Sequence, residues 1–133
     1  MKNVLFLFGF LFLLVMGCES GPSTNSDEEV VEVIGVANFA SGIQNDRGAQ
    51  LLDVRTPAEY DLGTIPGSIH INYFDENFRE QLEAQLDKKK PVYVFCRSGN
   101  RSNKAAVIMR EMGFKKVYDL DGGWLAWNGR PLN

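Results

Sequence analysis

The sequence has few of the residues from which metal, disulfide and nucleotide sites are built. Its 133 residues include two cysteines and one histidine, His70, so no cluster of His and Cys ligands and no disulfide framework is available. G-x-G-x-x-G and P-loop motifs are both absent. With 14 Lys and Arg against 17 Asp and Glu, the chain also lacks the positive charge that neutralises nucleic-acid phosphates. We therefore expect no metal, no cofactor and no nucleic-acid partner.

The composition that remains is that of one folded domain. Hydrophobic residues make up 44% of the chain and aromatic residues 11%, which is too apolar for a disordered protein. A chain of 133 residues suits a single core, whereas two would be cramped. We expect one domain that is monomeric.

Residues 1–17 are typical of an export signal rather than of a folded element. Lys2 precedes an apolar run, residues 4–16, which is shorter than the roughly 20 residues of a membrane-spanning helix. The run ends in Val15-Met16-Gly17-Cys18, which resembles the lipobox of bacterial lipoproteins. That resemblance implies a lipidated Cys18 at the new N-terminus. An uncleaved anchor, or ordinary cleavage that leaves Cys18 a free thiol, are the alternatives, and each still exports the protein.

Residues 18–29 are small, polar and acidic, and such a segment buries too little apolar surface to fold. We interpret them as a flexible tether between lipid chains in the membrane and a domain over residues 30–133. The predicted location is therefore the cell envelope or periplasm, with the membrane as a partner through the lipid anchor.

From residue 30 onward, short apolar runs alternate with amphipathic segments. The predicted strands are 30–34, 51–54, 68–72, 92–95 and 117–120. The predicted helices are 36–44, 57–62, 75–86 and 103–112, with a short fifth one after Gly122-Gly123. Alternation of strand and helix predicts an α/β fold, with a central, mainly parallel five-stranded sheet and helices on both faces.

Two of these segments have clear patterns. Phe74, Phe78, Leu82 and Leu86 recur every four residues, which predicts a helix face that packs on the sheet. Residues 92–95 are apolar without alternation, as in a central strand covered on both faces. Ligands of such sheets bind beyond the carboxyl ends of the strands, and Cys96 follows this strand directly.

The loop after this strand has the composition of an anion-binding nest. It comprises Cys96, Arg97, Ser98, Gly99, Asn100, Arg101 and Ser102. Backbone N–H groups that curl around the sulfur, and a helix capped by Ser102, would stabilise a thiolate. Cys96 also has no partner for a disulfide within the chain if Cys18 is acylated. An inert, buried thiol is the alternative interpretation.

Several ordered motifs resemble those of the rhodanese-like sulfurtransferases. The resemblance covers about residues 30–130 and rests on four segments: 51–60 (LLDVRTPAEY), 63–72 (GTIPGSIHIN), the loop 96–102 (CRSGNRS) and 121–127 (DGGWLAW). Thr64 departs from the family, which commonly has His at this position.

The resemblance implies a two-step transfer of sulfane sulfur through a Cys96 persulfide, with no cofactor. A small anionic donor such as thiosulfate would be attracted by Arg97 and Arg101. The acceptor would be a thiol, cyanide or a protein thiol. The family pattern further implies that Asp53, Arg55 and Glu59 brace the loop. We also expect Trp124 and Trp127 to pack in the core or its rim rather than to form a stacking platform.

Two other functions remain open at the sequence level. Cys-based phosphatases and arsenate reductases also hold a thiolate in an amide nest, but they place five residues between Cys and Arg, whereas four separate Cys96 from Arg101. A non-catalytic rhodanese module that binds a partner or senses redox state would carry the same fold.

Overall fold

The computed structural model describes residues 29–128. The predicted signal segment, Cys18 and nearly all of the predicted tether lie outside the described residues, as do residues 129–133. Between residues 29 and 128, no helix is long and apolar enough to cross a membrane.

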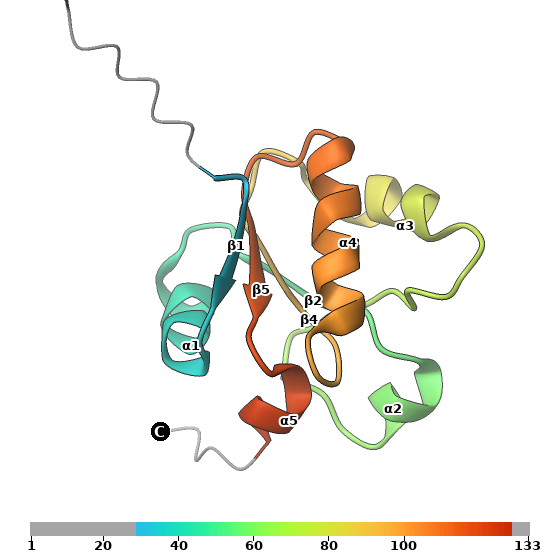
Figure 1. Ribbon diagram of the computed structural model, residues 1–133. Helices are drawn as coiled ribbons and strands as arrows, with labels where there is room; N and C mark the ends of the chain where they lie inside the picture. Colours follow the sequence, from blue (N-terminus) through green and yellow to red (C-terminus); the bar gives the residue numbers. More distant parts are fainter. Residues whose placement is uncertain (1–28, 129–133) are drawn as a thin grey trace, which may run out of the picture.

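Five parallel strands form one sheet in the order β1-β5-β4-β2-β3 (Figure 1). The strands are β1 (Val31–Ile34), β2 (Gln50–Asp53), β3 (Ile69–His70), β4 (Val92–Phe95) and β5 (Val117–Leu120). All four pairings are parallel, which confirms the predicted sheet. The third strand is shorter than predicted, because only Ile69 and His70 pair with β2.

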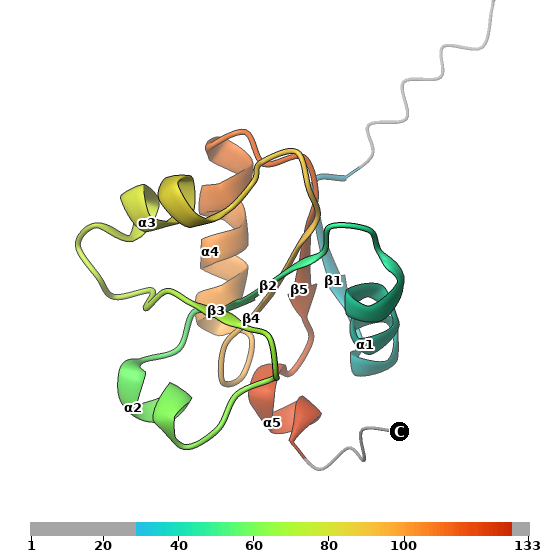
Figure 2. The same cartoon turned by 180° about the vertical axis from the view of Figure 1, so that it is seen from behind.

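Helices cover both faces of this sheet, as predicted (Figures 1 and 2). They are α1 (Val36–Asn45), α2 (Pro57–Asp61), α3 (Phe78–Gln85), α4 (Asn100–Glu111) and α5 (Gly123–Trp127). Helices α3 and α4 pack on one face, α1 and α5 pack on the other, and α2 lies at the carboxyl end of β2.

The core is divided by the sheet into two apolar clusters. Val92 and Val94 point into the cluster under α3 and α4, together with Leu82 of α3. Tyr93 and Phe95 point into the cluster under α1 and α5. All four residues of β4 are therefore buried, which explains why this strand shows no polar alternation.

Two helix starts differ from the prediction. Helix α3 begins at Phe78, because residues 72–78 form consecutive turns, and Phe74 is 65% exposed rather than packed on the sheet. Helix α4 begins at Asn100, three residues early. Its N-cap is Gly99, in the left-handed region at φ 106°, and the Gly99 carbonyl accepts from the Asn103 N–H. Ser102 is therefore inside the first turn, and its prediction as N-cap is wrong.

Leu82 provides a direct test of this packing. Leu82→Ala is expected to lower the free energy of unfolding by about 2–5 kcal/mol, because it leaves a cavity under α3. The matched control is Leu125→Ala, at a position that is 54% exposed. This substitution is expected to change the free energy of unfolding by no more than about 0.5 kcal/mol. Urea unfolding of both variants measures the difference, and equal losses would contradict the assigned packing.

Candidate active site

Cys96 lies where the central strand ends and α4 begins. Its side chain is buried, and the Gly99 N–H donates to Cys96 Sγ at 3.1 Å. The left-handed conformation of Gly99 turns the chain so that loop and helix form one short enclosure around the sulfur.

The enclosure favours the thiolate form of Cys96. Burial raises the pKa of the thiol, but the hydroxyl of Ser102 and the backbone N–H of Ser102 lower it, with the Gly99 and Ser98 N–H groups adding to this effect. The donors outweigh burial, so the pKa of Cys96 lies below its ordinary value. The lowered pKa favours the thiolate, which is the nucleophilic form of a cysteine.

Helix α5 holds the other side of the loop. The Trp124 N–H donates to the Cys96 carbonyl at 2.8 Å, and the Leu125 N–H donates to the Arg97 carbonyl at 3.1 Å. The close approach of α5 to the loop requires glycine at position 123, because φ is +56° there and a Cβ atom would lie 2.5 Å from the Cys96 carbonyl oxygen. We call these two hydrogen bonds the α5 clamp. The sequence analysis did not predict the clamp, although the paired glycines 122 and 123 were a signal for it.

Arg55 and Asp53 form a buried ion pair beside this clamp. Arg55 Nη2 lies 2.7 Å from Asp53 Oδ2, and the two side chains are 2% and 0% exposed. The same nitrogen donates to the Gly63 carbonyl at 2.6 Å, and Thr64 Oγ1 donates to Asp53 Oδ2 at 2.8 Å. The guanidinium also stacks over Trp124, with its carbon 4.6 Å from the ring centroid.

Glu59 belongs to a second ion pair, with Arg101 of α4. Its two carboxylate oxygens accept from Arg101 Nη1 and Nη2 at 2.7 and 2.8 Å. The Arg101 hydrogen bond outweighs partial burial, and Thr56 adds to it, so the pKa of Glu59 falls to about 2. Thr56 and Glu59 also form a capping box at the start of α2. The three predicted bracing residues are thus divided between two separate ion pairs.

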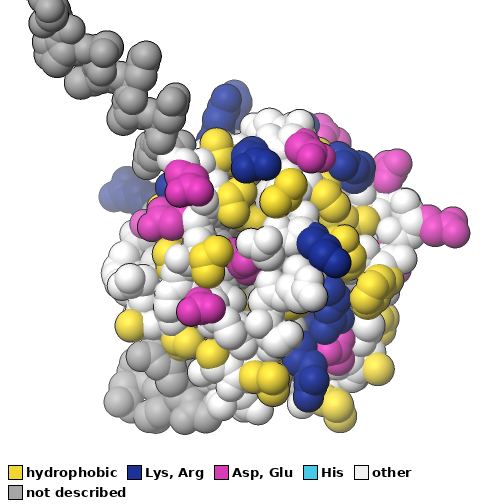
Figure 3. Space-filling view, in the orientation of Figure 1, with side chains coloured by type: hydrophobic (Ala, Val, Ile, Leu, Met, Phe, Trp, Pro, Cys, Tyr) yellow, Lys and Arg dark blue, Asp and Glu magenta, His cyan; other side chains and the backbone are white. Residues whose placement is uncertain are grey.

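A cavity of about 230 Å³ lies beside the Cys96 loop, at Arg97. It is lined by Arg55, Glu59, Leu62, Arg97, Trp124 and Leu125. On the face shown in Figure 3, basic and hydrophobic side chains lie next to each other over α2 and α4. Leu62 is 91% exposed, and Phe74 lies under the Arg101 guanidinium, 5.7 Å from its ring centroid. The surface beside the Cys96 loop therefore combines charged side chains with exposed apolar ones.

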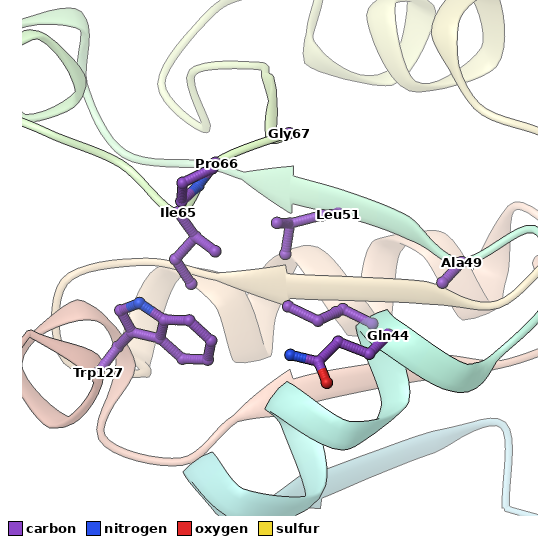
Figure 4. A pocket seen from close by; sticks show the side chains of 8 residues that line it. Gln44, Ala49, Leu51, Ile65, Pro66, Gly67 and Trp127 are labelled. Atoms are coloured by element: carbon purple, nitrogen blue, oxygen red, sulfur yellow. The ribbon is translucent and has the colours of Figure 1, made fainter. Parts of the chain in front are cut away.

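A second cavity, of about 350 Å³, lies between α1, α5 and the segment before β3 (Figure 4). Leu51, Ile65 and Trp127 point into it, and Gln44 is its largest polar side chain. Among residues 29–128, its lining includes no titratable side chain.

The remaining residues considered from sequence have structural contacts. His70 Nε2 is hydrogen bonded to the Arg55 carbonyl at 2.8 Å, and its ring stacks on Tyr60. Trp127 is buried in the core, as expected. Within residues 29–128, no group of three or more His, Cys, Asp or Glu side chains could hold a metal ion.

Asp119 is a buried acid that the sequence analysis missed. It lies on β5, is 2% exposed, and its Oδ1 atom has no hydrogen-bond partner among the described residues. Burial raises the pKa of Asp119 to about 6, although the side chains of Ser102 and Asn103 act in the opposite direction. The presence of an acidic residue within the otherwise apolar segment 117–120 was the sequence signal for this buried carboxyl group.

The described residues thus form a parallel α/β sheet with a cysteine among backbone N–H groups at its carboxyl edge. Residues 36–130 match the rhodanese-like domain family, and the chain belongs to that family.

Relatives and solved structures agree with this assignment. Thiosulfate sulfurtransferase GlpE of Pseudomonas paraeruginosa is 42% identical over 82 residues, which cover 62% of this chain and 72% of that protein. YrkF of Bacillus subtilis is 30% identical over 112 residues, which cover 84% of this chain but only 59% of YrkF. The crystal structure of a rhodanese-related protein from Thermoplasma volcanium has a TM-score of 0.64 and 31% identity, covering 75% of this chain and 95% of that one.

The Glu59–Arg101 pair predicts how stability depends on pH. Because the pKa of Glu59 is lowered from 4.5 to about 2, the pair stabilises the fold above pH 4.5, and this contribution is lost as the pH falls towards 2. Glu59→Gln is expected to cost about 1–2 kcal/mol at pH 7 and to flatten the stability curve below pH 4.5.

Thermal unfolding between pH 2 and 7 measures this effect. The matched control is Glu111→Gln, which removes a half-exposed ion pair with Arg79 and is expected to change stability by less than about 0.5 kcal/mol. If the stability of Glu59→Gln changes with pH in parallel with that of the parent over the whole range, the assigned role of the Glu59–Arg101 ion pair is contradicted.

Proposed function

We propose that this protein is a sulfurtransferase of the thiosulfate type, with Cys96 as the nucleophile that carries the sulfur. The observation that carries the proposal is the set of hydrogen-bond donors around Cys96 Sγ, led by the Gly99 N–H at 3.1 Å. Relatives named thiosulfate sulfurtransferase support the same chemistry.

The reaction proceeds in two displacements. The Cys96 thiolate attacks the outer sulfur of thiosulfate, the sulfur–sulfur bond of the donor breaks, and sulfite leaves with the bonding electron pair. A Cys96 persulfide remains, whose terminal sulfur is held by the N–H groups of the loop. An acceptor thiolate then attacks that terminal sulfur, and Cys96 leaves as the thiolate. No proton transfer is required in either displacement.

The two arginines of the loop have different roles. Arg97 is exposed, lines the cavity beside the Cys96 loop and has no ion-pair partner within residues 29–128, so it makes the first electrostatic contact with an anionic donor. Arg101 is held by both oxygens of Glu59, so its main contribution is to fix α2 against the loop.

The apolar rim favours a protein thiol as the acceptor. Leu62, Phe74 and Leu125 are 91%, 65% and 54% exposed, and they are three of the four large hydrophobic side chains that are exposed between residues 29 and 128. Exposed apolar side chains gathered around a reactive group are typical of a surface that another protein covers. A small anion such as cyanide would gain nothing from them.

The phosphatase alternative is less well supported by this geometry. An arginine that stabilises a phosphoryl oxyanion has to direct its N–H groups into the nest, but both Nη atoms of Arg101 are bound to Glu59. The short loop between Cys96 and Arg101 also fits one sulfur atom better than a tetrahedral phosphate.

We further propose that the domain is exported and anchored to the membrane of the cell envelope through a lipid on Cys18. This rests on the sequence of residues 1–29 alone. A lipid anchor would supply the membrane affinity, and the tether would leave the Cys96 loop accessible to partners.

The persulfide is tested by intact mass. The full chain carrying Cys18→Ser, incubated with thiosulfate in mild detergent, is expected to gain one sulfur atom that dithiothreitol removes. Introduction of Cys96→Ser into the same background is expected to abolish the gain. If Cys96 is alkylated rapidly but gains no sulfur, the proposed activity is wrong, and phosphate and arsenate become the substrates to examine.

Lipidation is tested in bacterial cells by incorporation of labelled palmitate. The parent chain and Cys96→Ala are expected to be labelled equally, whereas Cys18→Ala is expected to lose the label. Full labelling of Cys18→Ala would contradict the proposed anchor.

A further inference from the structure

A line of basic side chains continues from the Cys96 loop onto α4. Arg97 belongs to the loop, while Arg101 and Lys104 are three residues apart on α4 and therefore lie on one face of the helix. In Figure 3, basic side chains over α4 lie in a line with hydrophobic side chains on both sides of it. We call Arg97, Arg101 and Lys104 the basic stripe.

Two cations of the basic stripe are available to a partner. Arg97 and Lys104 are exposed, and neither has an ion-pair partner within residues 29–128. Arg101 instead binds both carboxylate oxygens of Glu59, which cancels one charge of the stripe. Asp61 ends α2 and so lies off this helix. The stripe therefore keeps positive charge that the carboxylates of a partner would complement.

Exposed apolar side chains lie next to the basic stripe. The Phe74 ring centroid is 5.7 Å from the guanidinium carbon of Arg101. Leu62 and Leu125 line the cavity of about 230 Å³ to which Arg97 also contributes. Each arginine of the stripe thus has an apolar neighbour, and a partner that covers these side chains removes apolar surface from water.

We propose that this surface binds an acidic segment of a protein whose cysteine exchanges sulfur with Cys96. Carboxylates of the segment contact the basic stripe, and apolar side chains that flank its cysteine pack on Leu62, Phe74 and Leu125. A basic protein with an equally reactive thiol is rejected, because like charges then meet. The inference rests on the proposed function and deepens it by giving the chemistry of the partner.

Peptide disulfides test this surface without requiring sulfur transfer. Two capped pentapeptides carry a central cysteine flanked by leucines and end in glutamates or in lysines, and each cysteine is joined to thionitrobenzoate. The Cys96 thiolate attacks the peptide sulfur, the disulfide bond of the probe breaks, and thionitrobenzoate leaves with the bonding electron pair, which absorbance records. The protein is the full chain carrying Cys18→Ser in mild detergent. Rates with 2-mercaptoethanol correct for the intrinsic reactivity of each peptide.

The parent chain is expected to react faster with the glutamate peptide than with the lysine peptide. Lys104→Glu is expected to lower this preference about threefold to tenfold, because it replaces an attraction by a repulsion. The matched control is Lys115→Glu, which reverses another exposed charge without an ion-pair partner among the described residues. Lys115 lies before β5, at the opposite end of the sheet from Cys96, so the preference is expected to stay unchanged.

Three results would overturn the proposed charge recognition. They are the absence of a preference in the parent chain, a preference for the lysine peptide, and equal losses in Lys104→Glu and Lys115→Glu. Absence of any reaction with both peptides would also overturn it.

The apolar contact is tested with a third peptide, in which serines replace the leucines of the glutamate peptide. Leu62→Ser is expected to slow the leucine peptide about threefold to tenfold more than the serine peptide. The matched control is Val33→Ser, which removes a side chain that is 54% exposed on β1 and is expected to slow neither peptide. Equal slowing of both peptides by Leu62→Ser would overturn the proposal. So would a dimer of the parent chain that Leu62→Ser dissociates in light scattering, because a second copy would then cover the surface.

Failure of the proposed function is recognised separately. If thiosulfate forms no persulfide but the peptide preferences are as expected, the proposed activity is wrong and the docking surface is retained. A normal persulfide in a chain without these preferences would retain the activity and overturn the docking surface.

Discussion

The geometry of the site depends on one buried cation. Arg55 is almost completely enclosed, and it joins four parts of the chain: the end of β2 through Asp53, the segment before β3 through the Gly63 carbonyl, α5 through Trp124, and β4 through Phe95, whose ring centroid lies 5.6 Å from the guanidinium carbon. A guanidinium in this position has to be neutralised and hydrogen bonded, since an unpaired buried charge would cost several kcal/mol. The contacts that satisfy Arg55 therefore also fix how these four segments lie around the cysteine.

The second ion pair and the α5 clamp extend this frame to the reactive loop. Glu59 holds α2 against the first turn of α4, while the N–H groups of Trp124 and Leu125 hold the loop carbonyls from the opposite side. The loop is thus positioned by contacts on both sides, and the donors around Cys96 are oriented before any substrate binds. Such preorganisation is what lets amide groups stabilise a sulfur anion despite its burial.

Much of this arrangement was predictable from the sequence, and the exceptions share one cause. The strands, their parallel orientation and the position of Cys96 follow from local patterns, because a buried central strand such as β4 has a distinctive composition. The early start of α4 and the exposure of Phe74 depend on hydrogen bonds in turns, which the spacing of the hydrophobic residues does not reveal. The α5 clamp and the burial of Asp119 arise from contacts between distant segments, which a linear pattern does not encode.

The clamp on the loop has a consequence for biosynthesis. Its donors, Trp124 and Leu125, are about 28 residues downstream of Cys96 and close to the end of the described domain. A chain emerging from the ribosome therefore presents Cys96 long before it presents the backbone that fixes the loop, and domains generally fold as complete units. Until residue 127 has emerged, the loop around Cys96 lacks the two backbone hydrogen bonds that fix it from the side of α5.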